Sequence, residues 1–407
     1  MKCRHCAHDL THEFLDLGAA PPSNAYLTTE TLHGAEMYLP LRLLVCDQCF
    51  LVQTEDYASA DTYFNEEYAY FSSISQSWIA HAAKFCNDMQ SRFDLNEGSL
   101  VIEVASNDGY LLKNFVGAGI PCLGIEPTDS TAEVAERIGV PTLRKFFGDA
   151  LGQELASSES RADLICGNNV YAHVPDINDF TRGLAAVLKP EGVVSLEFPH
   201  LMQLVDNGQF DTVYHEHFSY LSLLTVSRIF ATAGLRIFDV QQLSTHGGSL
   251  RVLGCLAGAA HEAQAQVDVV LSEERARSMD TLPYYMGFQQ RADAIKNAVL
   301  HFLLEARAEG KTVAGYGAAA KGNTLLNYAG VKPDLLPFVC DAAEAKIGKF
   351  LPGSRIPIRA PSILRNERPD YLLILPWNIA AEVRAQCADL AEQGTRFVTV
   401  VPELNIS

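Results

Sequence analysis

The densest cluster of ionisable side chains lies in one short segment, Tyr214-His215-Glu216-His217. Histidine titrates near neutral pH, so His217 has a pKa in the range of a general base. Glu216 or Tyr214 could orient it or act beside it. Two other interpretations stay open: the two histidines form a metal-binding pair, or the segment is a polar surface loop. A catalytic metal needs a third protein ligand, and none is spaced nearby.

Four of the ten cysteines form two Cys-x-x-Cys pairs, Cys3 with Cys6 and Cys46 with Cys49. Each turn presents two thiolates to one ion, and two turns complete a tetrahedral shell of four sulfurs around zinc. The 39 residues between the pairs exceed a tight zinc ribbon, but the cost of closing a loop grows only logarithmically with its length. Four protein ligands leave no open position, which predicts a structural zinc ion. The alternatives are four buried thiols or a redox pair.

A strand over 101–105 runs into a tight turn that contains Ala105, Asn107 and Gly109, with Glu103 on the strand. Small residues there let a ligand approach the backbone. Further on, Glu126 ends a second strand, where a carboxylate accepts hydrogen bonds from ribose hydroxyls. The turn resembles the first motif of class I S-adenosylmethionine methyltransferases, with Ala105 and Asn107 in place of two glycines. The alternative is an ordinary turn between strand and helix.

A later strand over 163–167 leads into Asn168 and then, in the following loop, His173. Polar groups at the carboxyl end of a parallel strand face the ligand crevice of a doubly wound sheet. We therefore assign Asn168 to cofactor binding. For His173 taken alone, an ordinary loop histidine is an equal alternative.

A second nucleotide-type turn, GYGAAAKGN at 315–323, follows another strand, and Asp341 ends a later one. This spacing satisfies the dinucleotide fingerprint and favours an NAD-dependent oxidoreductase as the rival interpretation. However, eight basic residues stand against five acidic ones between 301 and 360, which suits the diphosphate of a sugar nucleotide. We predict substrate contacts from Tyr316, Lys321 and Asn323. A purely structural relic of a nucleotide fold is the alternative.

Alternating strands and helices must position these turns. Apolar runs at 100–105, 121–126, 163–167 and 192–198 predict a parallel, doubly wound sheet, with a Pro/Gly turn at 188–192. Runs at 335–340, 371–375 and 396–401 predict a second α/β domain, and helical spacing predicts helices at 75–95 and over 259–309.

The predicted fold class is therefore α/β with three units. They are an N-terminal zinc-binding unit at 1–70, a class I methyltransferase Rossmann-like domain at 71–255, and linker helices with a second, C-terminal Rossmann-like domain at 256–407.

Length and charge limit the possible functions. At its length of 407 residues, the chain is expected to contain two or three domains. Its net charge of -18 and its pI near 5.1 argue against nucleic acid or an anionic membrane as a partner. No apolar segment is long enough to span a bilayer, and the first residues lack a secretory leader. We expect a cytoplasmic monomer with reduced thiols.

Taken together and in order, the motifs resemble those of the sugar C-3 methyltransferases that act on nucleotide-linked 4-keto-deoxy sugars. The resemblance spans all 407 residues. It includes the paired CxxC unit and FLDLG at 14–18, VIEVASNDGYLL at 101–112, FDTVYHEHFSYLS at 210–222, HGGSLRV at 246–252 and GYGAAAKGN at 315–323. It implies S-adenosylmethionine as the methyl donor, a structural zinc ion, and a nucleotide-linked 4-keto-deoxy sugar as substrate. His200 departs from the tyrosine that relatives often carry and receives no role.

The resemblance also implies residue roles. Tyr68, His173, Tyr214, Glu216 and His217 match positions that the family places around the reacting sugar. A ketone at C-4 acidifies the C-3 proton, so His217 is the candidate base, with Glu216 orienting it. Tyr214 and His173 would donate hydrogen bonds to the enolate oxygen. Besides the oxidoreductase, a zinc-stapled interaction protein without catalysis remains an alternative.

Overall fold

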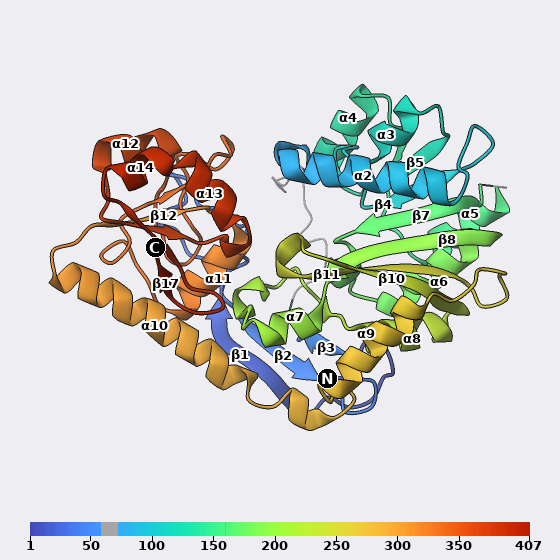
Figure 1. The fold of residues 1–407 in the computed structure, drawn as a ribbon, viewed down its shortest axis with the longest axis horizontal. Helices are drawn as coiled ribbons and strands as arrows, with labels where there is room; N and C mark the ends of the chain where they lie inside the picture. The colour runs from blue at the N-terminus through green and yellow to red at the C-terminus, as the bar shows by residue number, and fades with distance from the viewer. Residues whose placement is uncertain (58–71, 159) are drawn as a thin grey trace.

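Three β-sheets organise the molecule. The computed structural model describes residues 1–57, 72–158 and 160–407. Its sheets have four, seven and six strands, in the orders β1-β2-β3-β9, β10-β11-β8-β7-β4-β5-β6 and β14-β13-β12-β15-β16-β17. Two α/β units stand side by side, and the N-terminal strands lie below and between them (Figure 1).

The seven-stranded sheet contains the strands predicted between 100 and 198. Its strands are β4 Val101–Val104, β5 Cys122–Ile125, β6 Thr142–Leu143, β7 Ala162–Asn168, β8 Leu188–Pro199, β10 Leu235–Leu243 and β11 Ser249–Leu256. β11 runs antiparallel to β8 and β10, and the other neighbours pair in parallel. Because the strand order reverses at β4, the loops after β4, β5 and β7 open on one crevice. The predicted doubly wound sheet is confirmed.

Helices cover both faces of this sheet (Figure 1). One face carries α2 Gln76–Arg92, α3 Leu112–Gly117 and α4 Asp129–Arg137, and the other carries α5 Asp149–Ser157, α6 Ile177–Val187 and α8 Leu223–Thr232. The sequence of α6 explains its place: Ile177, Phe180 and Leu184 recur at helical spacing and are all buried. Asp176 caps the helix by accepting a hydrogen bond from the backbone N–H of Asp179.

The Pro/Gly turn predicted at 188–192 does not interrupt the sheet. Residues 188–199 form one strand, β8, which pairs Leu188 with Ala162 and then skips to pair Val193 with Leu164. The segment with Pro190 and Gly192 is thus an irregularity inside the strand. Pro190 and Glu191 are exposed there, while the strand continues on both sides.

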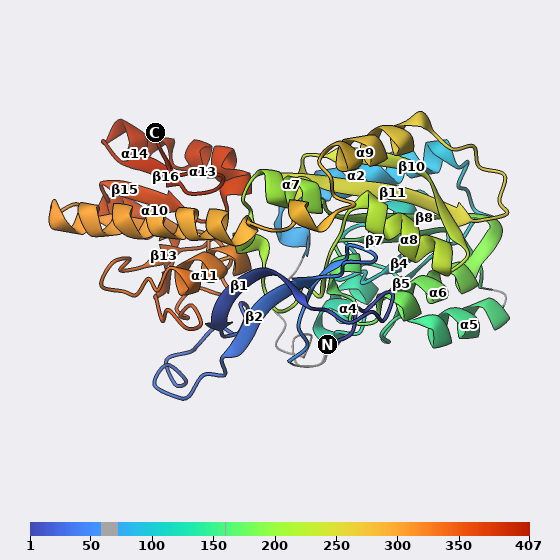
Figure 2. The same ribbon diagram turned by 90° about the horizontal axis from the view of Figure 1, so that it is seen from below.

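The four-stranded sheet joins the N-terminus to the segment that carries the ionisable cluster. Its strands are β1 His12–Ala20, β2 Leu39–Val45, β3 Val52–Thr54 and β9 Ser219–Tyr220, and all neighbours pair antiparallel. In the pairing of β3 with β9, Val52 faces Tyr220 and Gln53 faces Ser219. β1 and β2 form a long ribbon that reaches toward the C-terminal unit (Figure 2).

The C-terminal unit is a mostly parallel sheet with helices around it. Its strands are β12 Val313–Tyr316, β13 Val339–Cys340, β14 Ile358–Arg359, β15 Tyr371–Ile374, β16 Arg396–Thr399 and the antiparallel β17 Asn405–Ile406. Its helices are α11 Ala320–Tyr328, α12 Leu364–Glu367, α13 Ala380–Gln386 and α14 Ala388–Glu392. The predicted apolar runs of this region all contain strands.

The predicted linker helices are α9 Ala265–Ala276 and α10 Phe288–Ala308, with a 3-10 turn, η5 Leu282–Tyr284, between them. α9 packs on β10 and α8, whereas α10 shares one hydrophobic core with β1, the short helix α7 Leu201–Asp206 and the C-terminal sheet. The N-terminal ribbon and the C-terminal unit are therefore packed together. Among the described residues, no helix has the length and apolar character needed to cross a membrane.

Candidate active site

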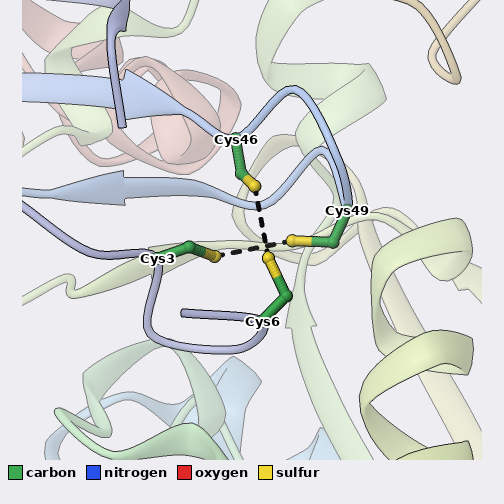
Figure 3. A group of neighbouring side chains, drawn as sticks. All are labelled: Cys3, Cys6, Cys46 and Cys49. Atoms are coloured by element: carbon green, nitrogen blue, oxygen red, sulfur yellow. Dashed lines mark hydrogen bonds between the residues drawn. The ribbon is translucent and has the colours of Figure 1, made fainter. Parts of the chain in front are cut away.

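The four predicted zinc ligands lie together. The Sγ atoms of Cys3, Cys6, Cys46 and Cys49 all lie within 4.8 Å of one another, with 3.5 Å from Cys3 to Cys49 and 3.4 Å from Cys6 to Cys46 (Figure 3). Zinc–sulfur bonds of about 2.3 Å in a tetrahedron place the sulfurs about 3.8 Å apart. The cysteines therefore fit a tetrahedral zinc ion, and the predicted cluster is confirmed.

The zinc cluster braces the N-terminal unit against the methyltransferase sheet. Gln53 donates a hydrogen bond to the Sγ of Cys3, and Thr225 of α8 donates one to the backbone carbonyl of Cys49. None of the four cysteines is among the described residues that line the large cavity of the molecule. This placement agrees with a structural role for the metal.

The cavity has a volume of about 600 Å³ and lies where the three units meet. The strand-end loops of the seven-stranded sheet, the ionisable segment and the start of α11 all contribute to its wall. It includes most of the residues predicted for cofactor, substrate and catalysis: Ala105, Asn107, Glu126, Asn168, His173, Tyr214, Glu216, His217 and Lys321.

The turn after β4 has the backbone of a glycine-rich loop, although two of its left-handed positions are not glycines. Ala105 has φ +57° and Asn107 has φ +51°, both in the left-handed region that glycine usually occupies. Glu126 holds the loop, because its two carboxylate oxygens accept hydrogen bonds from the backbone N–H groups of Asn107 and Thr128, each at 2.9 Å. Two strained residues in one loop indicate that the loop shape serves a ligand.

Asn168 fits the same ligand. Both polar atoms of its side chain are buried and have no hydrogen-bond partner within the described structure, although they border the cavity. Buried amides are normally hydrogen-bonded, so this side chain is suited to a ligand that offers both donors and acceptors. The amino-acid and ribose parts of S-adenosylmethionine offer such groups.

Two residues predicted for cofactor binding, Glu103 and Gly109, lie behind the cavity wall. Glu103 is buried, and burial together with the nearby carboxylates of Asp108 and Glu126 raises its pKa well above the usual value. A Cβ on Gly109 would lie 3.2 Å from Ala135 of α4, so packing accounts for this glycine. Neither is among the described residues that line the cavity.

A single backbone carbonyl orients the ring of His217. Its Nδ1 lies 2.9 Å from the backbone carbonyl of Thr212, so Nδ1 carries the proton and Nε2 keeps its lone pair. Burial and the neighbouring His173 lower its pKa well below the usual value. The rings of Tyr214 and His173 lie 4.0 and 4.6 Å from it, measured between centroids.

The carboxylate of Glu216 has a different partner from the one predicted. It accepts a hydrogen bond from the side-chain amide of Asn24 at 2.7 Å, and burial raises its pKa to about 7. The Thr212 carbonyl, and not Glu216, orients His217, which corrects that part of the prediction. Tyr68 lies outside the described residues.

The metal-pair interpretation of the two histidines does not hold. His215 bonds the backbone carbonyl of Leu39 at 3.2 Å and does not line the cavity, whereas His217 does. The search for metal-binding groups over the described residues finds the cysteine cluster and nothing in this segment. The two histidine side chains therefore lie in different environments.

Of the three residues predicted for substrate binding, Lys321 alone borders the cavity. Its ammonium donates to the side-chain oxygen of Asn378 at 2.8 Å and lies 4.7 Å from the ring centroid of Trp377. The hydroxyl of Tyr316 bonds Gln386 instead, and Asn323 is buried in α11; neither is among the described cavity residues.

A buried carboxylate ties this lysine to the methyltransferase unit. The indole N–H of Trp377, in the turn η7 Trp377–Ile379, donates to Asp211 at 2.8 Å. Burial raises the pKa of Asp211 to about 6. Asp211 belongs to the FDTVYHEH motif, so the sequence marked it, but only the structure connects it to Trp377 and Lys321.

The residues of the wall that were not predicted include Asn24, Trp78 and His246. His246 belongs to the HGGSLRV motif, which offered a signal without a role. Asn24 lies in the N-terminal unit, far in sequence from Glu216, and nothing in its surroundings marked it.

Comparisons with known proteins identify the family of the chain. Residues 3–64 match the family described as "Putative zinc binding domain", residues 78–240 a methyltransferase domain, and residues 244–402 the C-methyltransferase C-terminal domain. The C-methyltransferase NovU of Streptomyces niveus is 37% identical over 402 residues, which cover 99% of this chain and 96% of that protein. The chain belongs to this C-methyltransferase family. It is an S-adenosylmethionine-dependent enzyme with a structural zinc ion in its N-terminal unit.

Other similarities to this C-methyltransferase are partial. The uncharacterized methyltransferase ML2584 of Mycobacterium leprae (strain TN) is 30% identical over 101 residues, which cover 25% of this chain and 37% of that protein. The magnesium protoporphyrin IX methyltransferase of Synechocystis PCC 6803, solved with bound SAH, has 13% identity and a TM-score of 0.35. It covers 43% of this chain and 82% of that chain.

Proposed function

We propose that the enzyme methylates C-3 of a nucleotide-linked 4-keto-deoxy sugar, after removing the C-3 proton. One observation carries the proposal: a neutral, buried His217, whose Nε2 keeps its lone pair, lines the same cavity as the loops after β4 and β5 and a buried lysine. A base, a donor site and a cation in one enclosed space suit carbon alkylation of an acidic C–H in an anionic substrate.

The base works through its hydrogen bond. The Thr212 carbonyl holds the Nδ1 proton of His217, so Nε2 can take the C-3 proton and the ring becomes an imidazolium. The electron pair of the C–H bond then spreads over C-3 and the ketone oxygen as an enolate. S-adenosylmethionine supplies the electrophilic methyl group that the enolate carbon takes. Tyr214, against the His217 ring, is placed to donate to the substrate.

Two lysines support the nucleotide part of the proposal. Lys321 and Lys346 both border the cavity, in a chain whose net charge is -18. Lys346 also donates to the backbone carbonyl of Ala318, at the turn that precedes α11. Lys346 is also paired with Asp341 at 3.4 Å. Two ammonium groups beside this turn suit a diphosphate, so the C-terminal unit would hold the nucleotide.

The substrate class is tested by incubating the enzyme with S-adenosylmethionine and a panel of nucleotide-linked deoxy sugars, with and without a 4-keto group. We expect a mass gain of one CH2 unit only for 4-keto sugars. Methylation that ignores the ketone, or that favours free sugars over nucleotide sugars, would contradict the proposal.

The role of His217 is tested by His217→Asn, with the exposed His301→Asn as the matched control. Exchange of the C-3 proton with deuterated solvent isolates the deprotonation, because it needs no methyl transfer. We expect both exchange and methylation to disappear in His217→Asn and to persist in His301→Asn. Full exchange in His217→Asn would remove it as the base.

A further inference from the structure

His246 is a third histidine in the cavity wall, and the chemistry described above gives it no part. It lies in the short turn η4 Thr245–Gly247, between β10 and β11. Its φ is +53°, and Gly247 and Gly248 follow with φ values of +89° and +117°. A side chain in the left-handed region costs about 1 kcal/mol or more. Only a position that the surroundings dictate keeps a non-glycine residue there.

The surroundings of His246 fix its ring. The side-chain amide of Asn169 donates to its Nε2 at 3.0 Å, and the ring of Trp78 meets it edge-on with 5.2 Å between centroids. Asn169 is itself left-handed, with φ +56°, and its backbone N–H donates to the carbonyl of Glu197 at 2.7 Å. The carboxylate of Glu197 also accepts from Thr245 at 2.9 Å. Two strained residues thus hold one another beside the cavity.

The hydrogen bond from Asn169 decides where the proton of His246 is. An amide N–H2 only donates, so Nε2 accepts, and the single proton of the neutral ring is on Nδ1. Burial lowers the pKa of His246 to about 4, and the nearby Lys321 acts in the same direction, so the ring stays neutral. His217 has the same tautomer, but there the protein engages the Nδ1–H, which donates to Thr212, and the nitrogen with the lone pair, Nε2, is the one that remains.

The neighbouring His173 already donates its ring proton to the protein. Its ring donates a hydrogen bond to the backbone carbonyl of Glu216. This hydrogen bond raises the pKa of His173, but burial has the larger effect and lowers it to about 4. A neutral imidazole has one proton to donate. His246 is therefore the histidine of this wall whose proton remains for a ligand.

We propose that His246 is a catalytic hydrogen-bond donor, whose Nδ1–H bonds the ketone oxygen of the substrate and the enolate oxygen that replaces it. The inference rests on the proposed function, because it needs a ketone at the reacting centre. A neutral donor fixed in place stabilises charge that develops only during deprotonation, and it needs no reorganisation at that moment. His217 would remove the proton and His246 would stabilise the resulting oxyanion.

Two variants separate this role from a structural one. His246→Asn keeps an amide donor close to the position of Nδ1 and tolerates a left-handed backbone. His246→Gly removes the ring and relieves the strain. We expect C-3 deuterium exchange and kcat to fall by about 10²–10³-fold in His246→Gly. His246→Asn should recover most of that loss. S-adenosylhomocysteine binding and thermal stability should stay near wild type in both.

Exchange at the wild-type rate in His246→Gly, or an equal loss in both variants, would overturn the role of His246. A third measurement is independent of any substrate: ¹⁵N NMR of the histidines, with the His246 signals assigned by their loss in His246→Gly. We expect the neutral Nδ1–H tautomer at neutral pH, and an Nε2–H tautomer or a charged ring would overturn the proposal. If wild-type enzyme methylates no 4-keto sugar, the proposed function fails while this NMR result still stands or falls by itself.

Discussion

His217 and His246 lie in one cavity with opposite hydrogen-bonding polarity, and a single neighbour sets each. A backbone carbonyl makes His217 an acceptor at Nε2, and a side-chain amide makes His246 a donor at Nδ1. Burial keeps both rings neutral, because a buried imidazolium loses its hydration. The environment thus assigns the residues their separate chemistry.

Glu216 should make the enzyme less stable as the pH rises. Burial raises its folded-state pKa from 4.5 to about 7, so the folded state holds a proton that the unfolded state releases between these values. Wild-type stability should therefore fall from pH 4.5 to 7 and level off above it. Glu216→Gln keeps an acceptor for Asn24 and does not titrate. We expect it to exceed wild type by about 3 kcal/mol at pH 8.

Denaturant unfolding of both proteins at several pH values measures this difference. The same substitution at the exposed Glu97 serves as the control and should leave the pH dependence of stability as it is in wild type. A Glu216→Gln protein that tracks wild type at every pH would mean that the carboxylate is not buried as the structure has it.

The sequence marked most of the residues that matter but not their partners. The YHEH segment, the cysteine pairs and the Glu126 strand end stood out because their side chains are chemically unusual at that spacing. The contact between Asn24 and Glu216 joins positions that are remote in the chain, and no local pattern encodes it. For the same reason, the orienting role was assigned to Glu216 and belongs to the Thr212 carbonyl.

At the scale of elements, the N-terminal unit contributes to the cavity although its zinc ligands do not line it. β3 pairs with β9, which begins two residues after His217, and Thr54 donates to the backbone carbonyl of His217 at 3.2 Å. The N-terminal unit also supplies Asn24 to the cavity wall. Zinc thus stabilises a sheet whose last strand follows His217, the proposed base.

Removal of zinc should therefore lower both stability and activity. Cys46→Ala deletes one of four ligands, and we expect loss of the bound zinc, a lower melting temperature and loss of C-3 exchange. Cys387→Ala removes a buried thiol of the C-terminal unit and is the control, with one zinc per chain retained. Metal content by mass spectrometry and thermal unfolding report the outcome. Unchanged exchange in zinc-free Cys46→Ala would show that the sheet does not need the metal.

The predicted elements follow from strong local patterns. Apolar runs gave β4, β5, β7 and β8 of the seven-stranded sheet and β12, β13, β15 and β16 of the C-terminal sheet, and helical spacing gave α2, α9 and α10. The strands β6, β10, β11, β14 and β17 were not predicted. The Pro/Gly segment of β8 was misjudged because local turn chemistry competes with pairing on both sides, and the parallel neighbour β7 keeps the strand in the sheet. Pairing of β3 with β9 lay beyond prediction, since it joins distant parts of the chain.

At the scale of the whole molecule, the cavity exists because the two α/β units are held at a fixed distance. Trp377 of the C-terminal unit bonds the buried Asp211 of the other, and Thr324 of α11 donates to the backbone carbonyl of Val213 at 2.8 Å. Gly247 lies against the Trp377 ring, which leaves no room for a side chain. The sequence predicted the units and not this junction.

Gly247→Ala should open the junction. A Cβ there would lie 2.3 Å from a ring carbon of Trp377, at a φ of +89°. Gly394→Ala is the matched control, because φ is +101° and nothing lies within 4 Å of the added Cβ. The control should cost about 1 kcal/mol of stability from backbone strain alone.

We expect Gly247→Ala to cost clearly more than Gly394→Ala and to raise the KM for the nucleotide sugar, since Lys321 rests on the displaced Trp377 ring. Denaturant unfolding and steady-state kinetics of the two variants decide the matter. Equal losses in both would mean that the units are not in close contact at this point.

The central claim is carbon methylation at C-3 of a nucleotide-linked 4-keto sugar, and the most direct test is the position of the transferred methyl group. The enzyme is incubated with ¹³C-methyl S-adenosylmethionine and the accepted 4-keto sugar nucleotide, and the product is examined by carbon NMR. The account predicts one labelled methyl bonded to C-3, with the C-3 proton lost. A label on oxygen or nitrogen, or on any carbon that is not adjacent to the ketone, would contradict it.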